Sequence, residues 1–243
     1  MPLYRDDALV LRAQKLGEAD RIITLLTREH GKVRAVGKGV RRTGSKFGAR
    51  LEPFMHIDIQ LNEGRTFDMV TQVDTIGAYA KEICADYGRY TAASAIVETA
   101  DRLTVAEREP AVQQFWLAAG ALRALSLGHY PAELVLDSYL LRSFAVAGYA
   151  PSFDVCAQCG APGPHTSYAV ASGGAVCGAC RPPGAASPAP QTFAHMAALL
   201  SGDWPIVLAS PERSQREASG LIAAFTQYHL ERTIRALRLV ERP

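Results

Sequence analysis

The sequence lacks a long apolar run and lacks a strong excess of either charge. No apolar stretch approaches the roughly 20 residues that a membrane-spanning helix requires. Met1 leads directly into the charged segment Tyr4 to Asp7 rather than into the apolar core of a signal peptide. The net charge of the 243 residues is only +2, and 48% of them are hydrophobic. We therefore expect a globular protein of the cytoplasm, with no membrane association.

Cysteine is also scarce, but four of the five cysteines are paired closely in sequence. Cys156 and Cys159 form one Cys-x-x-Cys pair, and Cys177 and Cys180 form a second, with residues 160–176 between them. This spacing is typical of two zinc knuckles, and in a reducing cytosol paired thiols favour metal over disulfide. Four thiolates leave no open coordination position, so we predict one structural Zn²⁺ ion.

Two other interpretations of these cysteines are open, namely two redox dithiols or four buried thiols. A redox Cys-x-x-Cys usually opens a helix after a strand, whereas these pairs lie in segments rich in glycine and proline. Cys84 stands apart from the four, and we interpret it as a small residue at the start of a helical core.

Alternating apolar residues predict strands in the first part of the chain. In the segment from His56 to Leu61, Ile57, Ile59 and Leu61 fall on a single face. The segment 65–76 repeats the alternation after a turn at Asn62-Glu63-Gly64. Earlier apolar runs are separated by turn signals and lie at 9–11, 22–26 and 33–36. About five strands in this length predict a small closed barrel such as an OB-fold over residues 1–79.

Beyond residue 79 the apolar period becomes helical. One predicted helix places Tyr87, Tyr90, Ile96, Val97, Ala100 and Leu103 on a broad face. A second begins near Pro110, ends at Gly128, and would bury Phe115, Trp116, Ala119, Leu122 and Leu125. Three more are predicted over 131–148, around 193–200 and from Pro211 to about Leu239, the last burying Leu221, Ile222, Phe225, Tyr228 and Ile234.

Residues 151–190 are too poor in large apolar side chains to form a core of their own, so something else must order them. The sequence therefore predicts an α+β multidomain protein, in which an N-terminal barrel is followed by an all-α domain with an inserted Cys₄ zinc finger. The expected boundaries are 1–79 for the barrel, 80–150 and 191–243 for the helical domain, and 151–190 for the finger and its linker.

The basic residues are distributed unevenly, because between Arg28 and Arg50 the only acid is Glu29. Gly37 to Arg50 is a glycine-punctuated segment between two predicted strands, and loops of OB barrels use such cations to bind the phosphates of single-stranded DNA. Phe47 is the candidate base stacker, with a core position as an equal alternative. A solvated charged face is the simpler interpretation of the charge run, but because acidic neighbours are so few we favour contact with nucleic acid. The candidate nucleic-acid contacts are Lys32, Arg34, Lys38, Arg41, Arg42, Lys46 and Arg50, together with Phe47.

A phosphate-binding P-loop is excluded at the same place. The gap between Gly31 and Gly37 is one residue too long, and Gly39 stands where a Ser or Thr would hold magnesium.

Several of these segments together resemble the RecO family of recombination mediators. The residues that carry the resemblance are 17–32, the Lys38 to Arg42 loop, and Leu51 to Phe54. Further matches are Leu140 to Arg142 and Gly148 to Pro151, which precede the first cysteine pair. The resemblance spans most of the chain.

The resemblance implies an OB-fold and a helical domain with an inserted zinc finger, in a protein without catalytic turnover. It implies binding of single- and double-stranded DNA and annealing of complementary strands. It also implies contacts with RecR and with the C-terminal tail of the single-strand-binding protein, so that RecA is loaded indirectly, in the cytoplasm at the nucleoid. Some family members lack the four cysteines, so zinc is not essential to the family activity.

Two other functions are weighed against this one. A zinc-dependent deaminase or hydrolase needs His-x-Glu followed downstream by Pro-Cys-x-x-Cys, but His229-Leu230-Glu231 follows the cysteines and Val155 replaces the proline. A zinc-ribbon transcription factor would carry cations on its knuckles. Between the cysteine pairs there is neither Lys nor Arg, only His165, with Arg181 just beyond. We therefore expect a DNA-binding protein that is not an enzyme.

Overall fold

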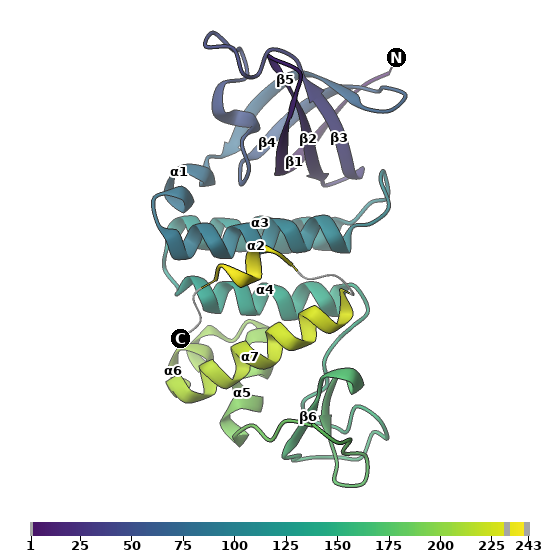
Figure 1. Cartoon of the computed structure of the whole chain (residues 1–243), viewed down its shortest axis with the longest axis vertical. Helices are drawn as coiled ribbons and strands as arrows, with labels where there is room; N and C mark the ends of the chain where they lie inside the picture. Colours follow the sequence, from purple (N-terminus) through teal and green to yellow (C-terminus); the bar gives the residue numbers. More distant parts are fainter. Residues whose placement is uncertain (1, 231–233, 241–243) are drawn as a thin grey trace. The chain divides into compact units, whose positions relative to one another are not determined.

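The computed structural model describes residues 2–230 and 234–240. The chain divides into two compact units, Met1–Tyr130 and Pro131–Pro243 (Figure 1). The predicted helical domain thus contributes its first helices to the unit that contains the barrel, and the remaining helices to the unit that contains the cysteines. None of the described helices is long and apolar enough to cross a membrane.

The first unit begins with a closed five-stranded barrel, which confirms the predicted fold class. Its strands are β1 (Leu3–Leu16), β2 (Asp20–Thr27), β3 (Gly31–Gly37), β4 (His56–Asn62) and β5 (Asp68–Gly77). They close in the order β1-β2-β3-β5-β4. The β3–β5 junction is parallel and has only two residue pairs, Ala35↔Asp68 and Val36↔Met69. The barrel is therefore closed least extensively at this junction.

The barrel core confirms the alternation read from the sequence, because Ile57, Ile59 and Leu61 are all fully buried. β1 is much longer than the apolar run at 9–11 that predicted it. It pairs with β4 over one half and β2 over the other, with a bulge between Val10 and Arg12. Polar residues are tolerated along its ends because only its middle is buried on both faces.

Three helices complete the first unit: α1 (Tyr79–Cys84), α2 (Tyr87–Leu103) and α3 (Val112–Leu127). The Asp86 carboxylate caps α2 by accepting the backbone N–H of Arg89 at 2.8 Å. Gly128 ends α3 with a φ of +66°, as predicted. Trp116 was predicted to be buried and is exposed, because successive helical residues point about 100° apart and Phe115 takes the inward position.

The described residues of the second unit form four α-helices and a short hairpin. The helices are α4 (Ala132–Val146), α5 (Pro190–Ser201), α6 (Trp204–Ala209) and α7 (Glu212–His229), and the hairpin is β6 (Ser167–Ala169) with β7 (Gly174–Val176). The sequence predicted neither the hairpin nor α6. The last predicted helix is shorter than expected, since α7 ends at His229, residues 231–233 lie outside the described part, and Ala236–Arg238 form a separate 3₁₀ turn. Tyr228 was expected in the core and is exposed.

Candidate nucleic-acid interface and metal centre

The four paired cysteines come together in the second unit. Their Sγ atoms all lie within 4.8 Å of one another, and no disulfide joins them. Cys156 and Cys159 belong to the turn that ends at Gly160, and Cys177 and Cys180 belong to the turn that follows β7. The β6–β7 hairpin therefore brings two sequence-local pairs to one point, and these residues could hold a metal ion.

The electrostatics of the thiols also fit a cation. The backbone N–H of Cys177 points at Cys156 Sγ at 3.4 Å, and this hydrogen bond is the main reason why the pKa of the Cys156 thiol is lowered to about 6. The pKa of Cys180 is raised, first by its hydrogen bond with Cys177 and then by that with Cys159. Several thiolates this close repel one another, and a bound divalent cation would offset that repulsion.

The two histidines named in the sequence analysis, His165 and His229, lie against other groups of the fold. His165 Nε2 lies 3.0 Å from the carbonyl oxygen of Ala161. His229 packs against aromatic rings, with centroids 4.3 Å from Phe225 and 4.8 Å from Tyr149. Glu231, the other half of the His-x-Glu pattern, lies outside the described residues. Among those that are described, the cysteine set is the one group arranged to hold a metal.

The loop that joins β3 to β4 lies at one end of the barrel, and most of its Lys and Arg side chains are exposed. Arg41 Nη1 donates to the carbonyl of Glu18 at 2.7 Å, which ties the loop to the β1–β2 turn. Lys46 Nζ donates to the carbonyl of Thr71 at 3.1 Å, and Arg50 donates to the carbonyl of Lys46 at 3.0 Å. These bonds orient the side chains without neutralising their charge.

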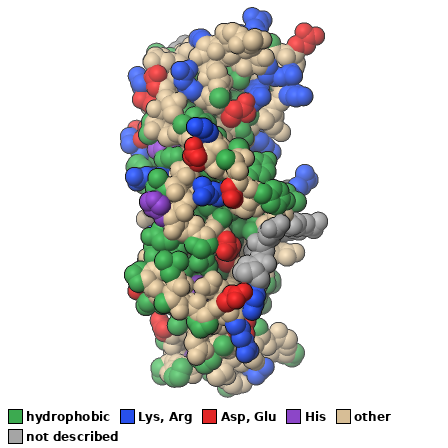
Figure 2. All heavy atoms as spheres, turned by 90° about the vertical axis from the view of Figure 1, so that its left-hand side faces the viewer, with side chains coloured by type: hydrophobic (Ala, Val, Ile, Leu, Met, Phe, Trp, Pro, Cys, Tyr) green, Lys and Arg blue, Asp and Glu red, His purple; other side chains and the backbone are tan. Residues whose placement is uncertain are grey.

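We call this set of exposed cations the basic loop, and its members are Lys38, Arg41, Arg42, Lys46 and Arg50. Within the described chain, none of them forms an ion pair with an acidic side chain. On the face drawn in Figure 2, Lys and Arg side chains gather over the barrel with fewer Asp and Glu among them. The loop therefore presents uncompensated positive charge to solvent.

The two candidate cations on β3 differ from the basic loop, because each already has an acidic partner. Lys32 Nζ lies 3.2 Å from Asp101 Oδ1 and donates to the Asp101 carbonyl at 2.8 Å, and its side chain is only 13% exposed. Arg34 Nε lies 2.6 Å from Glu107 Oε1. This pairing could not be read from the sequence, since Asp101 lies at the end of α2 and Glu107 in the loop that follows it, both far from β3 along the chain.

Phe47 is not placed to stack on a base. Its side chain is 2% exposed and packs in the barrel core with Val40 and Leu51, so the core alternative is the one that the structure adopts. The basic loop folds back through the 3₁₀ turn η1 (Gly48–Leu51), and an apolar side chain in the middle of the loop closes the end of the barrel. The loop thus provides charge but no exposed aromatic ring.

A different aromatic residue, Phe67, lies beside a candidate DNA contact, and the sequence analysis did not name it as one. It lies half-buried in the β4–β5 loop, and the Arg34 guanidinium carbon sits 5.1 Å from the centre of its ring. The sequence analysis assigned Phe67 to strand alternation. The signal that could have found it is its place after the Asn62-Glu63-Gly64 turn, because the loop between the last two strands of an OB barrel is a common nucleic-acid contact.

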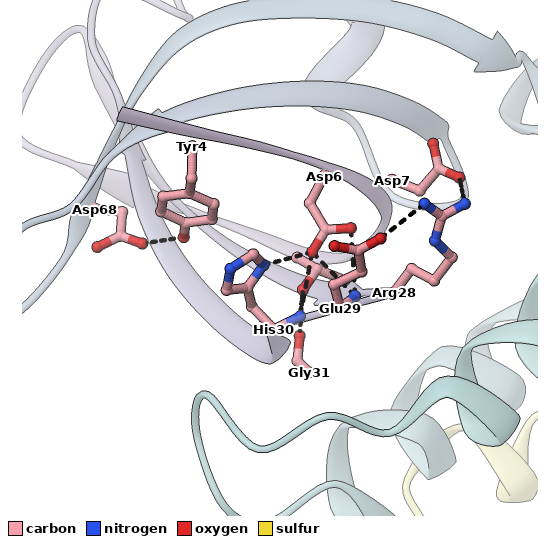
Figure 3. A network of polar contacts seen from close by, with 9 residues as sticks. Tyr4, Asp6, Asp7, Arg28, Glu29, His30, Gly31 and Asp68 are labelled. Carbon is pink, nitrogen blue, oxygen red and sulfur yellow. Dashed lines mark hydrogen bonds and ion pairs between the residues drawn. The ribbon is translucent and has the colours of Figure 1, made fainter. Parts of the chain in front are cut away.

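Two acidic residues of the barrel, Asp6 and Asp68, are buried and held within the fold (Figure 3). The Asp6 carboxylate accepts the backbone N–H groups of Glu29 and His30 and contacts the His30 ring at 2.8 Å. Tyr4 donates its hydroxyl to Asp68, and burial followed by this bond raises the pKa of Tyr4. Asp6 thus joins β1 to the β2–β3 turn and Asp68 joins β5 to β1, so both carboxylates are satisfied locally rather than by the basic loop.

Comparison with known proteins gives matches over nearly the whole chain. The family model described as "Recombination protein O N terminal" matches residues 1–79, and the one described as "Recombination protein O C terminal" matches residues 84–238. A protein of Thermobifida fusca named "DNA repair protein RecO" is 59% identical over 242 residues, covering 100% of both chains. Proteins of the same name from a Nocardioides species and Streptomyces griseus are 57% and 56% identical, over 99% and 100% of this chain and 100% of their own.

Proposed function

Because the chain belongs to the RecO family and so has a role in recombinational DNA repair, we propose that it binds single- and double-stranded DNA and anneals complementary strands. The observation that carries this proposal is the basic loop, which exposes five cations on a small barrel without an acidic partner in the described chain. Small barrels of this kind bind nucleic acid through cationic loops at the barrel rim.

The mechanism is electrostatic and needs no catalytic group. Cations of the basic loop replace counterions condensed on the phosphates, and the released counterions favour binding. Two strands held on such a surface repel each other less, so complementary sequences pair more readily. For single strands each phosphate contact contributes about 0.7 to the slope of log K against log salt, so full use of the basic loop gives a slope of roughly −3.5. The protein therefore acts as a mediator and not as an enzyme.

In the cell we propose that the protein works with RecR and with the C-terminal tail of the single-strand-binding protein. Binding to both would place it on coated single-stranded DNA in the cytoplasm, at the nucleoid. Annealing of strands and indirect loading of RecA would follow from that location. Family membership supports this part of the proposal.

We further propose that the Cys₄ cluster holds one structural Zn²⁺ ion. Cys156, Cys159, Cys177 and Cys180 would be its ligands, and the ion would supply a closed tetrahedral cross-link without an open position for chemistry. The buried apolar cluster between α4 and α5 contains only Cys156, Ala169 and Val176, too little to hold the segment by itself, so this cross-link would hold the finger in shape. DNA binding by the basic loop would not depend directly on the metal.

The test of DNA binding is the triple substitution Arg41→Ala, Arg42→Ala and Lys46→Ala. Affinity for a single-stranded oligonucleotide is measured by fluorescence anisotropy at several salt concentrations. We expect weaker binding and a salt slope flatter by about 2, because three phosphate contacts are lost. An unchanged affinity in the folded triple variant would reject the assignment.

A matched control removes the same amount of charge elsewhere. Lys81, Arg213 and Arg216 are exposed cations outside the barrel, so their replacement by alanine lowers the net charge equally. We expect the control to keep the wild-type salt slope. Equal loss in both triple variants would show that net charge, and not the basic loop, drives binding.

A further inference from the structure

A loop from the helical part of the first unit lies along β3. We call residues 104–111, which join α2 to α3, the strap. Its Arg108 N–H donates to the Lys32 carbonyl at 2.9 Å, and Glu107 forms an isolated parallel bridge with Lys32. Gly31 allows this approach, since a Cβ at that position would lie 1.7 Å from the Glu109 carbonyl oxygen. The strap backbone is therefore held close against the strand.

The strap is also held by a buried charge. Arg108 Nη2 lies 2.5 Å from Asp68 Oδ1, and Arg108 Nη1 lies 3.4 Å from Glu63 Oε1. The Asp68 side chain is only 1% exposed, so removing its partner would leave a buried carboxylate without a counter-charge. The strap thus stays on the barrel, and a side chain of the strap can move without the strap itself leaving.

Glu107 is the side chain of the strap that faces a candidate DNA contact. Its carboxylate lies 2.6 Å from Arg34 Nε, but the Nε–H has no partner in hydrogen-bond geometry. Both side chains are partly in water, with exposed fractions of 40% for Arg34 and 41% for Glu107. An exposed ion pair without an aligned hydrogen bond is weak and open to exchange.

Arg34 also contacts an aromatic ring, because its guanidinium carbon lies 5.1 Å from the centre of the Phe67 ring. Arg34 therefore lies close to both a ring and a carboxylate. A nucleotide offers the same two kinds of group, a base that stacks on rings and a phosphate that carries one negative charge like a carboxylate. The groups around Arg34 therefore match the chemistry of one nucleotide of a single strand.

We propose that Arg34 and Phe67 form a subsite for one nucleotide and that Glu107 covers Arg34 in the free protein. This inference rests on the proposed DNA binding. The strand phosphate replaces the Glu107 carboxylate on Arg34, so one anion is exchanged for another, while the base stacks on Phe67. Attachment of the same strand to the basic loop supplies the high local phosphate concentration that drives the exchange. Lys32 takes no part, because it is nearly buried and bound to two oxygens of Asp101.

The first test removes the competing carboxylate. Glu107→Gln should tighten binding of an oligothymidylate by about two- to fivefold at low salt, since the weak ion pair no longer opposes the phosphate. Glu109→Gln is the matched control, because it removes the same charge two residues away from a side chain without an ion pair in the described chain. When Arg34 is already replaced by alanine, Glu107→Gln should raise the affinity for the oligothymidylate no more than Glu109→Gln does. An equal gain for Glu107→Gln and Glu109→Gln overturns the exchange.

The second test separates base from phosphate. Phe67→Leu should weaken binding of an oligothymidylate by about fivefold or more, and should leave binding of an abasic oligonucleotide of equal length unchanged. Equal loss on both ligands overturns the subsite, because Phe67 would then act only by supporting the barrel. Thermal melting of each variant shows whether it is folded.

The two proposals fail in different ways. If the basic-loop triple variant loses affinity but Glu107→Gln behaves like its control, the subsite is wrong and the proposed function stands. If the basic-loop triple variant binds like wild type, the basic loop does not carry the proposed DNA binding. The effect of Glu107→Gln with and without Arg34→Ala then still tests the subsite.

Discussion

Glu217 stabilises a helix that it does not belong to, and its removal gives a sharp test of the second unit. The first residue of α5 is Pro190, and its N-cap Ala189 has no capping side chain. Glu217 of α7 supplies the missing acceptor, because its Oε2 accepts the backbone N–H of Ala189 at 2.9 Å and the hydroxyl of Thr192 at 2.7 Å. Its other oxygen lies 3.0 Å from Arg213 Nε. The carboxylate thus fixes the point where the finger segment enters α5.

The magnitude follows from these contacts. A hydrogen bond to a charged group contributes about 1.5–3 kcal/mol, and we take the low end because the Glu217 side chain is 27% exposed. The exposed pair with Arg213 adds little. In Glu217→Ala, water can replace part of the two hydrogen bonds from the Ala189 N–H and the Thr192 hydroxyl. The substitution should therefore lower the free energy of unfolding by about 2 kcal/mol. In a protein of this size that corresponds to a drop in Tm of roughly 4–8 °C.

The assay is thermal unfolding followed by circular dichroism, with Glu212→Ala as the matched control. Glu212 lies on the same helix and forms a comparable ion pair with Arg216, but it is largely exposed and caps nothing in the described chain. The control should change Tm by less than about 2 °C. Equal shifts for Glu217→Ala and Glu212→Ala would refute the cross-helix capping argument.

The pH dependence gives an independent check. The Ala189 N–H, followed by the Thr192 hydroxyl, lowers the pKa of Glu217 from 4.5 to about 2. The folded state therefore binds this proton less tightly than the unfolded state, so the stabilisation is complete above pH 4.5 and is lost as the pH falls toward 2. The stability difference between wild type and Glu217→Gln should shrink over that window.

Three further predictions concern the metal, the barrel and the buried histidines. Cys177→Ser should abolish zinc binding measured by elemental analysis and lower Tm, while single-strand affinity stays within about twofold of wild type; a stable wild-type protein without metal contradicts this. Phe47→Ala should lower the free energy of unfolding by about 3–5 kcal/mol in denaturant titrations, because a buried ring is removed from the barrel core, and a change below about 1 kcal/mol contradicts the packing. Burial lowers the pKa of His56 and of His195, so the unfolded state binds more protons and stability should fall as the pH drops below about 6.5; His195→Gln should reduce that fall in Tm, and an unchanged pH profile contradicts it.

Features that depend on neighbours in sequence could be predicted, and those that depend on distant neighbours could not. The cysteine pairs are local, and so is the alternation of Ile57, Ile59 and Leu61, and the structure bears out both the clustering and the burial. The pairing of Lys32 with Asp101 spans 69 residues and leaves no trace in either segment. The sequence therefore does not show whether a Lys or Arg side chain has an acidic partner in the folded protein.

The same limit explains Phe47 and Phe67. Phe47 lies in a loop between predicted strands and Phe67 lies in a predicted strand, but each is a phenylalanine close to Lys or Arg, so the sequence could not tell which ring faces solvent. The decision depends on how the loop folds over the barrel end, where Phe47 meets Val40 and Leu51. Phe67 remains half-exposed because its loop is short and turns beside β3.

The short β3–β5 junction has a consequence for any fragment of this protein. Only Ala35 and Val36 of β3 pair with β5, so the beginning of that strand is covered by the strap instead. A fragment that stops at residue 79 would lose the strap and leave Gly31 to Arg34 as a bare strand edge, free to pair with other chains. Such a fragment should self-associate, whereas one that extends to Tyr130 keeps its edge protected and should remain monodisperse.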